Sequence, residues 1–253
     1  MEIKRVLYAA NLKEPTYNLL EGLVGIKKIG LEEIILLSHS PPEELKQRLS
    51  EHGINLRAVE GSGPLVSRVL DSAQREDVSL IVANIKREKR GFFRPSTAKN
   101  LIKNTHLPLL LIYENEKERN YHRKKGIFDS VVLATDWSAA AQRALNYILV
   151  LKEIIGVLDI VNVLNEKPTV RDIRQLKVRI EEIRKICLRE KIDAESHIYA
   201  GKTPEEVLLA AKDYSATLIV MGTGCKGTIK EIFSGSASYR VAEEATVPVL
   251  IIP

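Results

Sequence analysis

The chain has 253 residues and a mass of 28.4 kDa, a length that suits one large α/β domain or two domains of ordinary size. Hydrophobic residues make up 45% and charged residues 28% of the chain, which excludes a disordered or a membrane-spanning class. The formal net charge of +5, with a pI near 9.1, is only mildly basic for this size and gives no reason by itself to expect nucleic-acid binding.

The sequence favours a cytoplasmic location with no membrane contact. Its longest apolar runs, residues 107–113 and 247–252, have the length of strands and are too short to cross a bilayer. The opening residues MEIKRVLYAANL lack the basic head and the long apolar stretch of a secretory signal. The two cysteines, Cys187 and Cys225, form neither a disulfide framework nor a metal-ligand spacing, which fits a reducing compartment.

Strand-like and helix-like runs alternate through the first half of the chain. Strands are expected at residues 5–10, 33–37, 55–60, 80–84 and 107–113, and helices at residues 17–28, 42–52, 65–75 and 98–103. The polar residues that follow, 114–125, mix both charges without an apolar period and indicate a linker.

The second half repeats the same alternation. Strands are expected at residues 130–135, 157–164, 194–199, 217–221 and 247–252, and helices at residues 139–154, 170–191, 204–214 and 232–245. Thr203 is the expected N-cap of the third of these helices, with Pro204 at its first position.

Short local matches align the two halves. Gly61-x-x-Pro64 matches Gly201-x-x-Pro204, and LIVAN at Leu80 matches LIVMG at Leu218. The sequence therefore predicts a tandem α/β protein of two open, Rossmann-like parallel-sheet domains, each with five strands and helices on both faces. We place the first domain at residues 1–113, the linker at 114–127 and the second domain at 128–253.

The stretch MGTGCKGTIKEIFSGS, residues 221–236, is rich in glycine. Gly222, Gly224 and Gly227 match the dinucleotide fingerprint G-x-G-x-x-G, but that loop should follow the first strand of its unit, and this one follows the fourth. A Walker A loop fails as well, because Gly227 is followed by Thr-Ile and not by Lys-Ser/Thr.

A longer pattern remains, in which a glycine turn at Gly222 is followed by the pair Gly235-Ser236. With its flanking strands LIVMG and VPVLII, this pattern resembles the nucleotide-binding signature of the universal stress protein family, G-x-x-G, nine residues, then G-S/T. The resemblance extends to both halves of the chain. One position departs from the signature, because Cys225 stands where the family has its second glycine.

The resemblance implies an adenine-nucleotide site in the C-terminal domain. Asp136, in the run VVLATDWS, corresponds to the acid that contacts adenine, and Val163 to the position whose main chain meets the base. ATP or AMP is the implied nucleotide, and Mg²⁺ is a candidate companion of ATP. The implied binding set is Thr135, Asp136, Val163, Met221, Gly222, Gly224, Cys225, Lys226, Gly235, Ser236 and Ala237.

The first half departs further from the family. Asn11 stands in the place of Asp136, and residues 84–96, which match the glycine loop, contain one glycine and no Gly-Ser pair. We expect this domain to have lost the nucleotide site and to complete an intramolecular pseudo-dimer, with homodimer formation left open. The basic residues around Phe92 and Phe93 are compatible with RNA binding, but we favour the interpretation that they form a solvated loop.

The predicted role is nucleotide-linked sensing or regulation. The five histidines are scattered, so no catalytic residue and no metal site is expected from their spacing. Two alternatives stay open: a scaffold for dimerisation or interaction that binds no nucleotide, and a slow ATPase. Asp136 also has a purely structural reading, as a helix N-cap.

Overall fold

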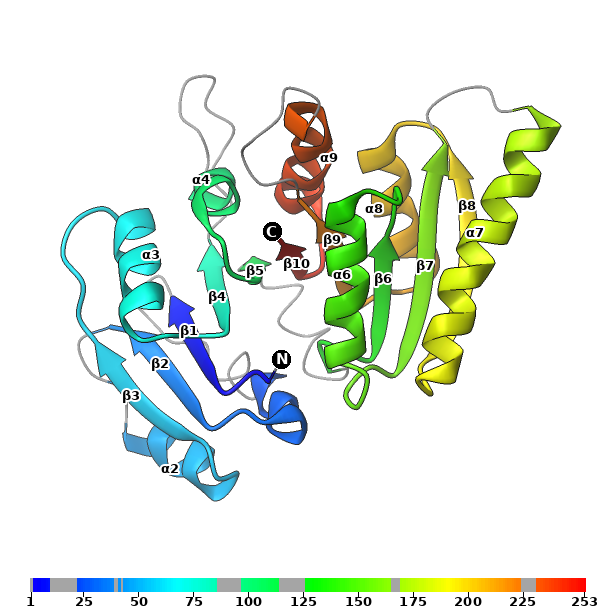
Figure 1. The fold of residues 1–253 in the computed structure, drawn as a ribbon. Helices are drawn as coiled ribbons and strands as arrows, with labels where there is room; N and C mark the ends of the chain where they lie inside the picture. Colours follow the sequence, from blue (N-terminus) through cyan, green and yellow to red (C-terminus); the bar gives the residue numbers. More distant parts are fainter. Residues whose placement is uncertain are drawn as a thin grey trace. The chain divides into compact units, whose positions relative to one another are not determined.

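The computed structural model describes residues 2–9, 22–38, 41, 43–85, 97–113, 126–164, 169–223 and 231–253; the side chains of residues 85, 113 and 231–236 lie outside this description. The chain divides into two compact units, Met1–Gly126 and Ile127–Pro253 (Figure 1). Among the described helices, none combines the length and the apolar character that crossing a bilayer requires.

The N-terminal unit contains a parallel sheet with the strand order β3-β2-β1-β4-β5. Helix α2 packs against β3, and α3 packs against β1 and α4. The strands are β1 (Arg5–Ala9), β2 (Glu33–Leu37), β3 (Asn55–Val59), β4 (Leu80–Ile85) and β5 (Leu109–Tyr113), and the helices are the 3₁₀ helix η1 (Val24–Ile29), α2 (Glu43–Glu51), α3 (Leu65–Arg75) and α4 (Thr97–Asn104).

Two elements of this unit differ from the sequence expectation by more than one residue at an end. The strand expected from residue 107 begins at Leu109, because Pro108 has no amide hydrogen to donate to a sheet. The helix expected over 17–28 is present as the 3₁₀ helix η1, which ends at Gly30 with a φ of 109°, while residues 10–21 lie outside the described part of the chain.

The C-terminal unit contains a parallel sheet with the strand order β10-β9-β6-β7-β8. The strands are β6 (Ser130–Ala134), β7 (Val157–Leu164), β8 (Asp193–Ala200), β9 (Leu218–Gly222) and β10 (Val249–Ile252), and the helices are α6 (Ala139–Val150), α7 (Val170–Arg189), α8 (Thr203–Asp213) and α9 (Glu231–Glu244). The strands follow one another along the sheet in the same order in both units, so the predicted fold class is confirmed.

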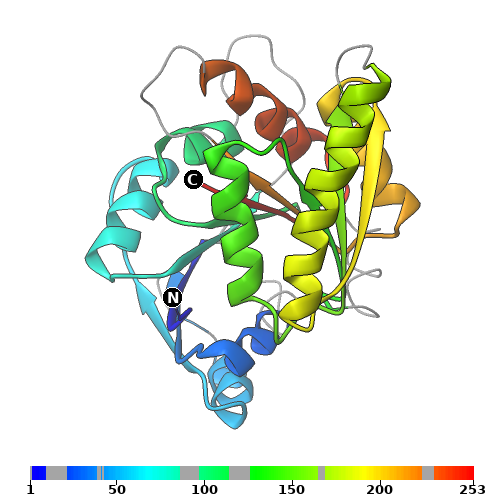
Figure 2. The same ribbon diagram turned by 45° about the vertical axis from the view of Figure 1, so that its right-hand side comes forward.

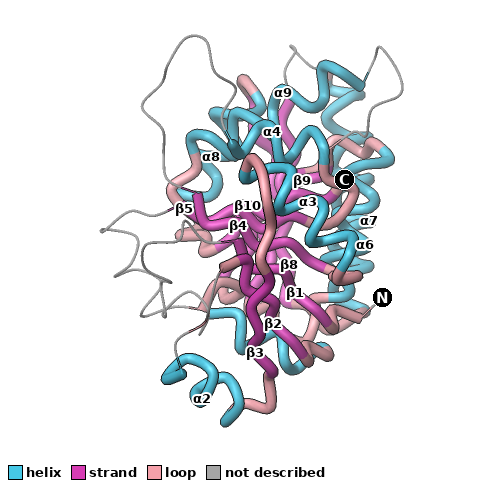
Figure 3. Tube along the Cα trace, turned by 90° about the vertical axis from the view of Figure 1, so that its left-hand side faces the viewer, coloured by secondary structure: helices cyan, strands magenta, loops and turns pink. Residues whose placement is uncertain are grey.

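The helices of the C-terminal unit cover both faces of its sheet. Figure 2 shows α6 and α7 side by side in front of the strands, and Figure 3 shows α8 on the opposite side of the strands from these two helices. Helix α8 contacts β7, β6 and α9. β6 and β9 are neighbouring strands, but the chain continues from β6 to β7 on one side of the pair and from β9 to β10 on the other side. The two connections therefore diverge between β6 and β9.

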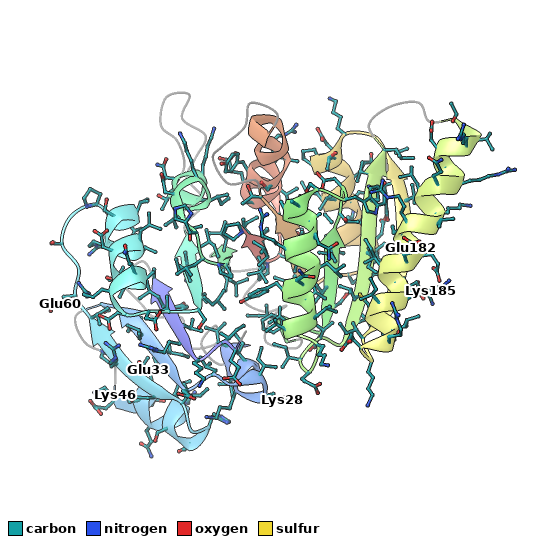
Figure 4. All side chains as sticks on the ribbon, viewed as in Figure 1. Lys28, Glu33, Lys46, Glu60, Glu182 and Lys185 are labelled. Carbon is teal, nitrogen blue, oxygen red and sulfur yellow. The ribbon has the colours of Figure 1, made fainter. Side chains whose placement is uncertain are left out.

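Helix α7 shows how the sequence encodes these layers. Its apolar stripe is buried against the sheet at Ile180, Ile183 and Cys187, and burial raises the pKa of the Cys187 thiol to about 11. Its outer face carries charged residues such as Glu182 and Lys185 (Figure 4). The raised pKa marks Cys187 as a packing residue, not a reactive thiol.

A buried threonine, Thr217, links the start of β9 to the start of β6. The Oγ1 of Thr217, just before β9, accepts a hydrogen bond from the Ser130 amide at 2.9 Å and lies 2.9 Å from the Ile127 carbonyl. Thr217 is completely buried, so water cannot replace these partners if the hydroxyl is lost.

We predict that Thr217→Val lowers the free energy of unfolding by about 1–3 kcal/mol, because it leaves the buried Ser130 amide without its acceptor while keeping the side-chain volume. Urea unfolding followed by circular dichroism measures the change. The control is Thr246→Val at an exposed threonine, which should shift stability by less than about 0.5 kcal/mol. Equal effects of both substitutions would contradict the role of the buried hydroxyl.

Candidate functional site

A pocket of about 440 Å³ lies at the carboxyl ends of β6, β7 and β9 in the C-terminal unit. This is the point where the connections of β6 and β9 diverge, the usual ligand position in open α/β sheets. Its lining residues come from three strands and three helices: Ala134, Thr135, Asp136, Ser138, Ala140, Ala141, Val161, Val163, Lys202, Thr203, Pro204, Val207, Met221, Gly222, Ala237 and Arg240.

Two hydrogen bonds to β7 hold Thr135 at the pocket floor. Its amide donates to the Val161 carbonyl at 2.9 Å, and its carbonyl accepts from the Asn162 side-chain amide at 2.8 Å. Thr135 and Asn162 are both buried. The end of β6 is therefore fixed to the neighbouring strand immediately before Asp136.

Asp136 lies at the mouth of the pocket, and one of its carboxylate oxygens is used locally. Its Oδ1 accepts a hydrogen bond from the Ser138 amide at 2.9 Å. The N-cap of α6 is Ser138, whose Oγ accepts from the Ala141 amide at 3.1 Å. The structural reading of Asp136 as the cap itself is therefore wrong, and its exposed carboxylate lines the pocket.

Trp137, between these two residues, has a left-handed backbone with a φ of 59°, which is rare for a bulky residue. Its ring lies under the Arg179 guanidinium of α7, whose central carbon is 4.5 Å from the ring centroid. This cation–π contact attaches the β6–α6 turn to α7 and offsets part of the backbone strain. The tight turn directs Asp136 toward the pocket and Trp137 away from it.

Gly222 owes its identity to packing at the pocket wall. A Cβ at this position would overlap the carbonyl of Ala140 and the amide of Ala141 in the first turn of α6. The backbone at the end of β9 is therefore in direct contact with the backbone at the start of α6, and only glycine leaves room for this contact. This requirement is independent of any ligand.

Two cations reach the pocket from the other face of the sheet. Lys202 precedes α8, and Arg240 on α9 forms an ion pair with Glu205 of α8 at 3.0 Å. A hydrogen bond with its own backbone amide, together with Arg240 and Lys202, lowers the pKa of Glu205. Lys202 is the N-cap of α8 and Thr203 its first residue, so the expectation that Thr203 is the cap was wrong by one residue.

The structure brings together six of the eleven residues expected in the site: Thr135, Asp136, Val163, Met221, Gly222 and Ala237. Gly235 and Ser236 fall within α9, but their side chains lie outside the described part. Gly224, Cys225 and Lys226 lie outside it entirely. The sequence analysis missed Lys202 and Arg240, although the Gly201-x-x-Pro204 match marked the loop that carries Lys202.

The fold and this pocket define a doubly wound α/β protein with a pocket at its switch point. A model described as the universal stress protein family matches residues 128–253, almost the whole C-terminal unit. The chain therefore belongs to the universal stress protein family through its C-terminal unit, and the two units form a tandem arrangement.

Two curated relatives match shorter stretches. Universal stress protein YxiE of Bacillus subtilis (strain 168) is 32% identical over 73 residues, which are 29% of this chain and 49% of the relative. A universal stress protein in the QAH/OAS sulfhydrylase 3′ region of Thermus aquaticus is 44% identical over 52 residues, which are 21% of this chain and 38% of the relative. The chain spans half or less of the length of these curated relatives.

One solved structure shares the fold over nearly the whole chain, and two others match about half of it. The crystal structure of a universal stress protein from Archaeoglobus fulgidus DSM 4304 covers 99% of this chain and 96% of its own, with a TM-score of 0.72 and 22% identity. An Archaeoglobus fulgidus universal stress protein in complex with dAMP covers 50% of this chain and 99% of its own, with a TM-score of 0.42 and 24% identity. Another was solved in complex with cAMP (49% of this chain, 96% of its own, TM-score 0.41, 22% identity).

We predict that Gly222→Ala destabilises the protein by about 1–3 kcal/mol, because the new methyl group collides with backbone atoms of α6 that cannot turn away. Thermal unfolding of the full chain measures the loss. Gly25→Ala is the matched control, since a Cβ there meets open space. If Gly222→Ala is as stable as the control, β9 and α6 are not in backbone contact.

Proposed function

We propose that the protein binds one adenine nucleotide, ATP or AMP, in the pocket of its C-terminal unit, and that the bound state serves a sensing or regulatory role. Mg²⁺ accompanies the nucleotide when it is ATP. The N-terminal unit has no nucleotide site in this proposal and acts as a built-in partner of the C-terminal unit. We place the protein in the cytoplasm, because its two cysteines form no disulfide framework and suit a reducing compartment.

The observation that carries the proposal is the convergence of six expected site residues with two unexpected cations on one pocket. Val161, Val163 and Val207 supply an apolar wall that suits the flat face of a purine ring. Asp136 supplies an acceptor for an exocyclic amine, which adenine carries. Lys202 and Arg240 supply the positive charge that a phosphate requires.

The size of the pocket supports the same class of ligand. Small-molecule sites in proteins have volumes of about 300–1,000 Å³, and this pocket has about 440 Å³. Its polar groups are few and come from different elements, as expected of a site that orients an otherwise apolar ring.

The position of α9 at the pocket supports a regulatory role. Ala237 and Arg240 belong to α9, and Arg240 already joins α9 to α8 through Glu205. A phosphate that attracts Arg240 competes with this ion pair. The nucleotide state would therefore alter the contact between α8 and α9, which is the surface we propose that other molecules recognise.

We predict that the full chain binds one AMP or ATP, as measured by isothermal titration calorimetry. Asp136→Asn and Lys202→Met should both weaken binding, but for different sets of ligands. Asp136→Asn keeps the oxygen that accepts from Ser138 but removes the charge, so affinity should fall about tenfold or more for AMP, ATP and adenosine alike. Lys202→Met should weaken ATP and AMP by a similar factor and leave adenosine unchanged.

Lys212→Met, at the far end of α8, is the matched control and should bind all three ligands like the parent protein. The absence of heat and of a thermal shift at millimolar nucleotide would contradict the proposal and favour the scaffold alternative. Steady phosphate release from ATP would favour the slow ATPase.

A further inference from the structure

A second cluster of ligating side chains lies on the face of the C-terminal sheet that α8 covers. Asp159 on β7 and Glu195 on β8 are register partners, and His197 follows two residues later on β8. Partners in neighbouring strands, and residues two apart along a strand, point to the same face. The three side chains accordingly meet, with their ligating atoms within 4.8 Å of one another.

Two members of this cluster are shielded from water. The side chain of Asp159 is only 11% exposed and that of His197 18% exposed. Glu195 lies at the exposed edge of the cluster. A nearby cation stabilises a buried carboxylate, and a metal ion can supply that charge.

A chain of hydrogen bonds continues from the cluster to the end of α8. His197 Nε2 lies 2.9 Å from Asp159 Oδ1, and His197 Nδ1 lies 3.0 Å from the Tyr214 hydroxyl. Asp213, the residue before Tyr214, accepts a hydrogen bond from the Tyr199 hydroxyl at 3.0 Å. The Tyr214 ring also stacks on the His197 ring with centroids 4.2 Å apart, which fixes the orientation of the imidazole.

The imidazole of His197 has a polar partner at each ring nitrogen, the Tyr214 hydroxyl at Nδ1 and Asp159 at Nε2. When Nδ1–H donates to Tyr214, the Nε2 lone pair faces the Asp159 carboxylate. A metal ion bound by both atoms makes that contact attractive.

Glu195 adds a second carboxylate within 4.8 Å of the other two ligating atoms, and two carboxylates suit a divalent cation. Ligands about 2.0–2.2 Å from one metal ion lie about 3–3.5 Å apart, and Asp159 Oδ1 and His197 Nε2 are already 2.9 Å apart. Tyr214 on Nδ1 is the outer hydrogen-bond partner that metal-ligating histidines usually have.

We propose that Asp159, Glu195 and His197 bind a divalent transition-metal ion on the face of β7 and β8 that α8 covers. One imidazole nitrogen with two carboxylates suits Zn²⁺ or Mn²⁺ better than Ca²⁺ or Mg²⁺. The site lies near the carboxyl end of α8, whereas the first residues of α8 line the nucleotide pocket. The two sets of residues are separate, so this proposal does not rest on the proposed nucleotide function.

The test is Zn²⁺ binding to the full chain, freed of any affinity tag and of metal by dialysis against a chelator. Competition with a chromophoric chelator gives the affinity, and elemental analysis after gel filtration gives the stoichiometry. We expect one Zn²⁺ per chain, at least tenfold weaker binding in Glu195→Gln and in His197→Gln, and unchanged binding in Asp193→Asn. Asp193 is the matched control because it is an exposed carboxylate on the same strand and the same face.

Glu195 is exposed, so its replacement tests the site without disturbing the core. The ¹⁵N signal of His197 Nε2, recorded with and without Zn²⁺, gives a second readout and should shift on metal addition in the parent protein but not in Glu195→Gln. Unchanged Zn²⁺ affinity in Glu195→Gln, or no binding of either Zn²⁺ or Mn²⁺, would overturn the proposal.

Discussion

The pocket of the C-terminal unit depends on the contact between the end of β9 and the first turn of α6. No side chain separates the two backbones at Gly222, so Met221 and the β6–α6 turn border the same small volume. The turn itself is fixed by the bonds of Thr135 to β7. A wider separation of α6 from β9 would move Asp136 away from the residues of β9, and the site would open toward solvent.

Helix α8 connects the two proposed sites of this unit. Its first residues line the pocket beside Lys202, and Tyr214, directly after its end, contacts the imidazole of His197. On its outer side, Glu205 pairs with Arg240 of α9. A ligand that binds Arg240 would therefore affect the start of α8, and a metal ion that binds His197 would affect its end. The packing of α8 against the sheet and α9 is the element we expect to differ between ligand states.

Much of the fold follows from local sequence patterns. The bounds of β2, α3 and β7 are those predicted, because each is an apolar run or stripe of typical length bordered by polar residues, glycine or proline. Pocket residues that directly end a strand, such as Asp136 and Met221, are placed by the rule that parallel strands present their carboxyl ends on one edge. The helix predicted over 139–154 instead ends at Val150, and residues 151–154 form turns.

The sequence could not place residues whose position depends on contacts between distant elements. Arg240 reaches the pocket because α9 packs on α8, and no local pattern specifies that packing. Asp159 and His197 meet through the pairing of β7 with β8, and their separation along the chain matches no ligand spacing. A shift of that pairing by one residue would point His197 to the other face.

The most direct test of the account is a crystal structure of the full chain grown with AMP. The account predicts one nucleotide per chain in the C-terminal pocket, with its adenine beside Asp136 and Val163 and its phosphate near Lys202 or Arg240. Density for AMP only in the N-terminal unit, or none in either unit at saturating concentration, would contradict it.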